Sequence, residues 1–242
     1  MTPNEYARTD ADVFAKGQQV MYLFGNDERT LLHNLRTSGS RLSDFFNLKE
    51  RERMTKSLFK AGQVVGVSEA LKKELQCDLK IPFGFKLVEK KPDFVWLRQI
   101  NPKDDKNIFI ARKKYTSLED FKRENLIRFR DDICHQYLFE DPEKPDTYLL
   151  TETNVPFIKV TADTINFNKH FAVQLRGIWR SNTFSMGGPF EGIAVVDEGT
   201  QQFYYVEGFT FSPGKDQREI MRELETIIYT FKTSKEIPAE KK

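Results

Sequence analysis

The chain has 242 residues, of which 39% are hydrophobic and 31% are charged, a composition typical of a globular protein with its own core. Its 38 basic and 36 acidic side chains give a net charge of +2, so no strong field favours a phosphate-rich partner such as nucleic acid. No apolar run approaches the roughly 18 residues of a membrane-spanning helix, and residues 1–12 lack the apolar stretch of a signal peptide.

The first part of the chain predicts a strand followed by helices. Val13–Phe24 reads as a strand because apolar and polar residues alternate near its end, and we expect its partner strand to come from a segment outside this chain. Asn26 or Asp27 is placed to cap a helix of apolar residues at helical spacing. A charged helix is predicted over Leu48–Lys60, and Ser68 is predicted to cap a third, short helix.

The middle of the chain predicts mostly strands. They are expected at Phe83–Val88, Phe94–Gln99, Asn107–Arg112, Thr147–Glu152 and Ile158–Asp163. Between the third and fourth of these, a long helix is predicted to begin at Ser117 and reach Tyr137, because apolar residues recur there at helical spacing and basic residues occupy the other face. The Pro-rich stretch Glu140–Asp146 is expected to be a loop.

The last part of the chain has the clearest pattern, with three strands before a closing helix. The first strand is predicted to share one face among Phe171, Val173, Leu175, Gly177 and Trp179. Strands at Phe190–Val196 and Phe203–Phe211 follow.

Two short motifs are expected to end these elements. Gly187, Gly188 and Pro189 predict a turn, because glycine tolerates unusual φ and proline fixes it. Ser212 is predicted to be the N-cap of the closing helix, with Pro213 at its first position. The apolar side of that helix carries Ile220, Leu224, Ile227, Ile228 and Phe231.

These elements predict an α+β fold. An antiparallel sheet packs against a long middle helix and a C-terminal helix, preceded by a mainly helical N-terminal segment. We expect residues 1–77 to form this N-terminal segment, as the remainder of a longer N-terminal domain. Residues 78–233 would form the α+β domain, and residues 234–242 a flexible charged tail.

Common catalytic signatures are missing from the sequence. It contains no Gly-rich phosphate loop, no dinucleotide fingerprint, no paired-histidine zinc helix and no complete nucleophile elbow. The two cysteines, Cys77 and Cys134, make neither a disulfide framework nor a metal site, and we expect two separate thiols. No metal and no cofactor is predicted.

Five side chains are the candidate ligand-binding residues. Glu207 lies in a row of aromatic residues that looks buried, so it needs a cation or hydrogen-bond donors, and Arg176 is the candidate partner. Either this pair is structural or Glu207 is a perturbed carboxylate in a cleft. Trp179 belongs either to the core or to a ligand groove. Arg218 and Arg222 share a helix face, as an anion site or as support for the helix.

Several short motifs resemble one family in their order and spacing. They are Asp12-Val13-Phe14-Ala15, Ile81-Pro82-Phe83-Gly84-Phe85, Asp93-Phe94-Val95-Trp96-Leu97-Arg98, Leu175-Arg176-Gly177-Ile178-Trp179, Met186-Gly187-Gly188-Pro189-Phe190, Val206-Glu207-Gly208-Phe209 and Arg222-Glu223-Leu224-Glu225. The chain resembles a Bacteroidota family of envelope lipoproteins, domain of unknown function forty-eight thirty-seven. At the level of fold it is also similar to PsbP-like domains.

The resemblance implies a place in the cell envelope, a lipid anchor in a full-length form, and another envelope protein as the partner. It implies no catalytic residues, because the family has none assigned. Asp163-Thr164-Ile165 resembles the short O-glycosylation acceptor of that phylum, with Thr164 as the modified residue. The other interpretation of these three residues is a turn between strands.

We therefore predict a non-catalytic binding or scaffold domain of a bacterial envelope lipoprotein. The alternative is a hydrolase-type enzyme with a site around Glu207, Arg176 and the Arg218–Arg222 helix face. Burial of Glu207 discriminates between them. A carboxylate enclosed and paired with arginine is structural, whereas one that opens into a pocket beside Arg176 or Trp179 favours a ligand site.

Overall fold

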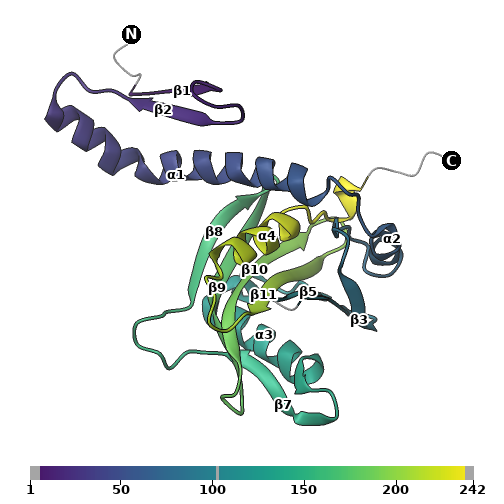
Figure 1. Cartoon of the computed structure of the whole chain (residues 1–242). Helices are drawn as coiled ribbons and strands as arrows, with labels where there is room; N and C mark the ends of the chain where they lie inside the picture. Colours follow the sequence, from purple (N-terminus) through teal and green to yellow (C-terminus); the bar gives the residue numbers. More distant parts are fainter. Residues whose placement is uncertain (1–5, 102–103, 238–242) are drawn as a thin grey trace. The chain divides into compact units, whose positions relative to one another are not determined.

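The computed structural model describes residues 6–101 and 104–237, which divide into two units, Met1–Ser57 and Leu58–Lys242 (Figure 1). The segment between residues 58 and 77 thus groups with the sheet by its contacts. The predicted separation of residues 1–77 and 78–233 into domains stays a prediction.

A β-hairpin opens the smaller unit. Strand β1 (Ala7–Ala11) pairs antiparallel with β2 (Gln19–Leu23). The chain reverses between them with Asp12 and Gly17 at positive φ, where the Asp12 carboxylate accepts a hydrogen bond from the Gly17 amide. The partner of the predicted strand therefore lies in this chain, and the expectation of an outside partner was wrong.

One long helix follows the hairpin. Helix α1 (Glu28–Leu58) runs without interruption where two helices were predicted. Asp27 caps it as one of the two expected residues, since its Oδ1 accepts a hydrogen bond of 2.7 Å from the amide of Thr30. Although α1 has 31 residues, no helix in the described part of the chain has the length and hydrophobicity to cross a membrane.

The larger unit is built on an antiparallel sheet. Within its described residues nine strands join, eight of them in the order β3-β4-β5-β11-β10-β9-β7-β6, with β8 also paired to β9. The strands are β3 (Lys86–Lys91), β4 (Phe94–Ile100), β5 (Asp105–Lys114), β6 (Phe139–Asp141), β7 (Lys144–Thr151), β8 (Thr161–Phe167), β9 (His170–Ser181), β10 (Gly187–Asp197) and β11 (Gln202–Phe211). The predicted loop over Glu140–Asp146 is thus a tight hairpin between β6 and β7.

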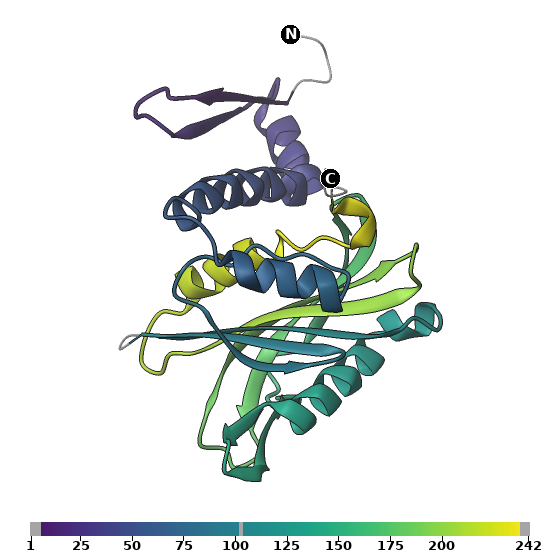
Figure 2. The ribbon, with the colours of Figure 1, turned by 90° about the vertical axis from the view of Figure 1, so that its right-hand side faces the viewer.

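Helices cover both faces of the sheet (Figure 2). Helices α2 (Val65–Glu74) and α4 (Arg218–Ile228) pack on one face, where the core includes Leu71, Val206 and Leu224. Helix α3 (Arg123–Tyr137) packs on the other, where the core includes Leu126, Leu175 and Trp179. The predicted α+β fold, with a sheet between a middle and a C-terminal helix, is confirmed.

Helix starts differ from the sequence prediction in two places. Ser117 does begin a helical segment through a capping box with Asp120, but this is a short 3-10 turn, Leu118–Phe121. The chain becomes extended at Lys122 (ψ 139°), and α3 then starts at Arg123. Ser68 is not an N-cap, because it lies inside α2 and its buried hydroxyl bonds the Asp78 side chain.

The predicted turn at Gly187, Gly188 and Pro189 is wrong, since all three residues open strand β10. Glycine serves close packing there. A Cβ on Gly188 would lie 2.1 Å from the backbone oxygen of Thr210, which also accepts a hydrogen bond of 3.2 Å from the Trp179 indole. Neither glycine has a positive φ.

The predicted cap of the closing helix is also wrong. Ser212 is buried and shares a hydrogen bond of 2.9 Å with the Thr210 hydroxyl, while its carbonyl accepts one from Gln217. Pro213 therefore lies in a loop, and α4 begins at Arg218. Four of the five residues of the predicted apolar side, Ile220, Leu224, Ile227 and Ile228, lie on α4 and pack in or against the core. Phe231 also joins the core, but it lies beyond the end of the helix.

One edge of β9 is shared by two strands. Thr151 at the end of β7 lies opposite Trp179, and Thr161 at the start of β8 lies opposite Arg176. The chain leaves this edge and returns to it three β9 positions further on, so residues 152–160 form a loop whose two ends lie close together. Phe157 in this loop is 95% exposed.

Candidate functional site

Glu207 is enclosed in the core beneath α3. Its two carboxylate oxygens accept hydrogen bonds of 2.8 Å each from Nε and Nη2 of Arg130, and the Tyr205 hydroxyl donates a third at 2.6 Å. Arg130 also bonds the hydroxyl of Thr151 and lies 4.0 Å from the ring centre of Phe190. Burial raises the pKa of Glu207, and Arg130 opposes that rise. Glu207 is thus enclosed and paired with an arginine, which favours the structural interpretation of this carboxylate.

Arg176 belongs to the opposite face of the sheet, so the predicted pairing of Arg176 with Glu207 is wrong. Its Nε donates a hydrogen bond of 3.0 Å to Glu191 on β10, and Gln174 donates one of 2.6 Å to the other oxygen of that carboxylate. Burial and then the charge of Glu225 raise the pKa of Glu191, while Arg176 opposes the rise. The sequence did not single out Glu191.

The five candidate residues do not converge on one site. Trp179 and Glu207 are almost fully enclosed on the α3 face. Arg176 lies on the α4 face, and Arg218 and Arg222 are on α4 itself. Thr164 is exposed on the edge strand β8, and the turn interpretation for it is wrong. Its glycosylation stays a prediction.

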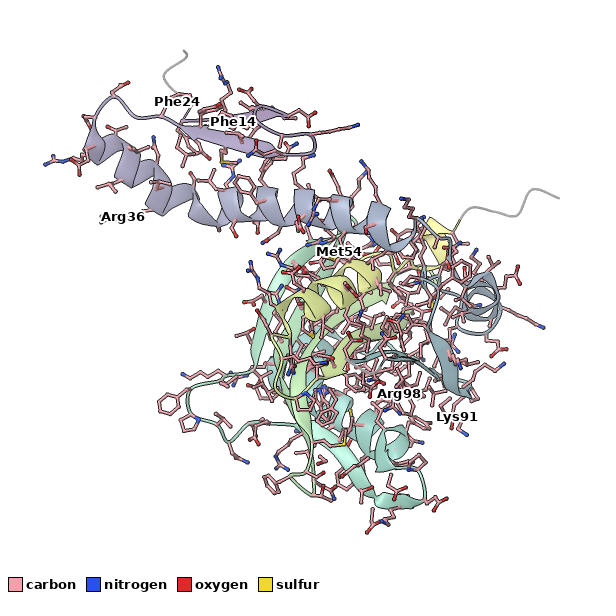
Figure 3. The ribbon with its side chains drawn as sticks, in the orientation of Figure 1. Phe14, Phe24, Arg36, Met54, Lys91 and Arg98 are labelled. Carbon is pink, nitrogen blue, oxygen red and sulfur yellow. The ribbon has the colours of Figure 1, made fainter. Side chains whose placement is uncertain are left out.

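An apolar groove lies between α2 and strand β3, which ends at the labelled Lys91 in Figure 3. The groove encloses about 370 Å³. Buried Leu71, Phe85 and Val95 line it beside more exposed aliphatic residues, which include Val64, Ala70 and Leu87.

Small residues on one side of α2 leave this space open. Gly66, Ala70 and Glu74 all line the groove, and their spacing of four residues puts them on one helix face. A Cβ added to Gly66 would meet no atom within 4 Å. This spacing is the one signal in the sequence that could have indicated the groove. It shows only one wall, because the other wall of the groove, β3, lies more than ten residues further along the chain.

Charged residues border the groove. Lys86 and Lys90 line it from β3, and Glu74 lines it from α2. Lys90 Nζ lies 2.8 Å from Glu74 Oε1, so this ion pair joins the strand to the helix. Lys86 has no carboxylate partner among the described residues.

Residues 65–230 match the family model described as Domain of unknown function (DUF4837). The chain belongs to this family. The matched range begins with α2 and ends just after α4, so in this DUF4837 protein the family region contains every lining residue of the groove except Val64, and both faces of the sheet. No curated protein sequence matches the chain.

The solved structures that are similar to this DUF4837 chain include the following two. The Ran-binding protein Mog1p of Saccharomyces cerevisiae is 7% identical over 65% of this chain and 90% of its own, with a TM-score of 0.41. LpqN, involved in cell envelope biogenesis of Mycobacterium tuberculosis, is 14% identical over 64% of this chain and 83% of its own, with a TM-score of 0.38.

The described residues of the DUF4837 protein contain no group of three or more His, Cys, Asp or Glu placed to hold a metal ion. Glu207 and Glu191 are each paired with an arginine, and buried Asp197 accepts hydrogen bonds from Ser234 and Gly199. The groove offers apolar walls with lysines at the rim. This arrangement is suited to binding.

Proposed function

We propose that this chain is a non-catalytic binding domain of a cell-envelope lipoprotein, and that it holds an apolar ligand in the groove between α2 and β3. One observation carries the proposal. The groove has aliphatic walls and a volume of about 370 Å³, within the range of roughly 300–1,000 Å³ for small-molecule pockets.

The state of Glu207 supports binding over hydrolysis. A general acid or base must reach the substrate, and Glu207 is 0% exposed with both oxygens bonded to protein groups. Glu191, the carboxylate that Arg176 contacts instead of Glu207, is held by Arg176 and Gln174. No specific contact favours the hydrolase alternative.

The envelope location rests on the sequence motifs that resemble the lipoprotein family. A ligand groove on the anchored domain would serve either to carry a lipophilic molecule or to hold a partner of the same compartment. Fractionation of native cells tests the location: recovery of the protein with the envelope membranes would support it, and recovery in the cytoplasmic fraction alone would contradict it.

Binding to the groove is tested with a neutral apolar probe, 1-decanol, by following the methyl NMR signals of the protein during titration. We expect the signals of Val67, Leu71 and Leu87 to shift together and to saturate. The Ala70→Phe variant fills the groove and should weaken decanol binding at least about tenfold.

The matched control is Ala61→Phe, the same substitution at an exposed residue outside the groove. It should leave decanol binding unchanged. Equal binding by both variants, with folded spectra for each, would contradict the groove as the site.

A further inference from the structure

Building on the proposed binding function, we infer that the ligand of the groove is a single-chain anionic amphiphile. Its aliphatic chain lies between α2 and β3, and its head group lies at Lys86. The shape of the groove, the protected edge of β3 and the charges at the rim all favour such a ligand.

The groove accepts one flexible chain. Along α2 it extends from Gly66 to Glu74, eight residues or about 12 Å at the rise of an α-helix. Its buried lining residues are aliphatic or aromatic and offer no side-chain donor or acceptor to orient a polar body. An aliphatic ligand chain has no polar atoms that would lose hydrogen bonds on entering the groove, and each methylene that it buries adds favourable free energy of binding.

A peptide strand is a poorer occupant because the edge of β3 is protected. The register of β3 against β4 shifts between Leu87 and Glu89, which marks a β-bulge. Lys86, Lys90 and Lys91 follow along the same short strand. Bulges and lysines on an edge strand oppose the addition of another strand.

The rim charges select an anionic head. Glu74 is paired with Lys90, so the three charged groups that line the groove leave one positive charge, that of Lys86. Lys86 lies opposite Arg98 and Lys90 opposite Val95, three positions apart on β4, which places the two lysines about 10 Å apart along the strand. A head group at Lys86 therefore need not disturb the Lys90–Glu74 pair. The electrostatic attraction between Lys86 and an anionic head group is stronger beside an apolar wall than in open water, because the effective dielectric constant is lower there.

Four probes with the same ten-carbon chain test this inference on the full chain at low salt: decanoate, decyl phosphate, 1-decanol and decyltrimethylammonium. We expect both anions to bind more tightly than decanol, by up to about fivefold, and the cation to bind most weakly. Decanoate and decyl phosphate together show which acidic head is preferred. Affinity should rise about fourfold per methylene from octanoate to decanoate.

Lys86→Ala should remove the difference in affinity between decanoate and decanol. Lys80→Ala, at an exposed lysine outside the groove, should leave that difference and the affinity for decanol unchanged. If wild type binds decanoate and decanol equally, the anionic head is wrong and the binding function stands. If no probe binds, the binding function itself fails. Binding of an extended apolar peptide in the groove without any binding of decanoate would overturn the ligand class.

Discussion

Arg130 and Glu207 meet through two parallel hydrogen bonds of 2.8 Å, although 77 residues separate them in the chain. Both side chains are 0% exposed. The pair fastens α3 to the central strand β11, with Tyr205 and Thr151 completing its hydrogen bonds. Because both charged groups are removed from water, each relies on the other for the electrostatic stabilisation that water would otherwise provide.

Glu207→Gln should destabilise the protein by about 3–5 kcal/mol, since it leaves the buried Arg130 guanidinium with only the longer contact of 3.5 Å to the Asp131 carboxylate. Urea unfolding followed by circular dichroism measures the change. Glu198→Gln, the same substitution at an exposed residue, should change stability by less than about 0.5 kcal/mol.

A double-mutant cycle separates the pair from its surroundings. Arg130→Leu with Glu207→Leu should lose less stability than the sum of the two single variants, because no unpaired charge remains. Strict additivity of the two losses would show that the residues do not act as a pair.

The sequence predicted the sheet faces but not this partnership. Alternation in β9 and β11 is visible in single segments, so the inward row of Val173, Leu175 and Trp179 could be predicted. The partner of Glu207 depends on which helix covers the strand. Arg130 lies in a helix rich in basic residues, and no local pattern distinguishes it from Arg128.

Gly188→Ala and Gly66→Ala should change stability in opposite directions. A methyl group at Gly188 would meet the Thr210 oxygen at 2.1 Å, so we expect a loss of about 1–3 kcal/mol. At Gly66 the methyl group has open space inside α2, so we expect a gain of up to about 1 kcal/mol. Thermal unfolding of the two variants measures both changes in stability. An unchanged stability of Gly188→Ala would contradict the close packing of Gly188 against Thr210.

Gly188 also shows where a prediction from local sequence fails. Gly187, Gly188 and Pro189 have the composition of a turn, and only the approach of a distant backbone oxygen explains glycine within a strand. The groove was missed for a related reason. Its two walls, α2 and β3, are separated in sequence, and each contributes only a few small or aliphatic residues.

Asp120→Ala should destabilise by about 0.5–2 kcal/mol at neutral pH, because Asp120 caps the turn before α3 and pairs with Lys113. Burial raises the pKa of Asp120, but hydrogen bonds from Lys113, Thr116 and Ser117 outweigh it and lower the pKa to about 2. A lowered pKa stabilises the folded state above the unfolded value of 3.8, and this contribution is lost as the pH falls toward 2.

The stability difference between wild type and Asp120→Ala should therefore shrink between pH 4 and pH 2, as seen in urea unfolding at each pH. Glu119→Ala, which removes a neighbouring carboxylate of an exposed ion pair, should show a small difference throughout. A difference for Asp120→Ala that stays constant over this range would contradict the lowered pKa.

Cys77 and Cys134 should both resist alkylation in the folded protein. Both are free and buried, and they lie in the cores on opposite faces of the sheet. Burial raises the pKa of both thiols, that of Cys134 to about 12, so little reactive thiolate forms near neutral pH. Mass spectrometry should find two alkylated cysteines after unfolding without a reductant. Finding none would indicate a disulfide.

The shared edge of β9 makes the exposed residues 153–159 a suitable site for inserting foreign sequence, since Glu152 is paired with Arg180 and Val160 is buried. Thr151 and Thr161 are ten residues apart in sequence but pair with β9 residues only three apart, Trp179 and Arg176. The pairing of β7 and β8 with β9 therefore does not depend on the length of the loop between them. A cut there would leave two fragments whose strands still pair along β9. The fold is thus suited to assembly from split halves, with a reporter sequence or a new recognition loop carried at that point.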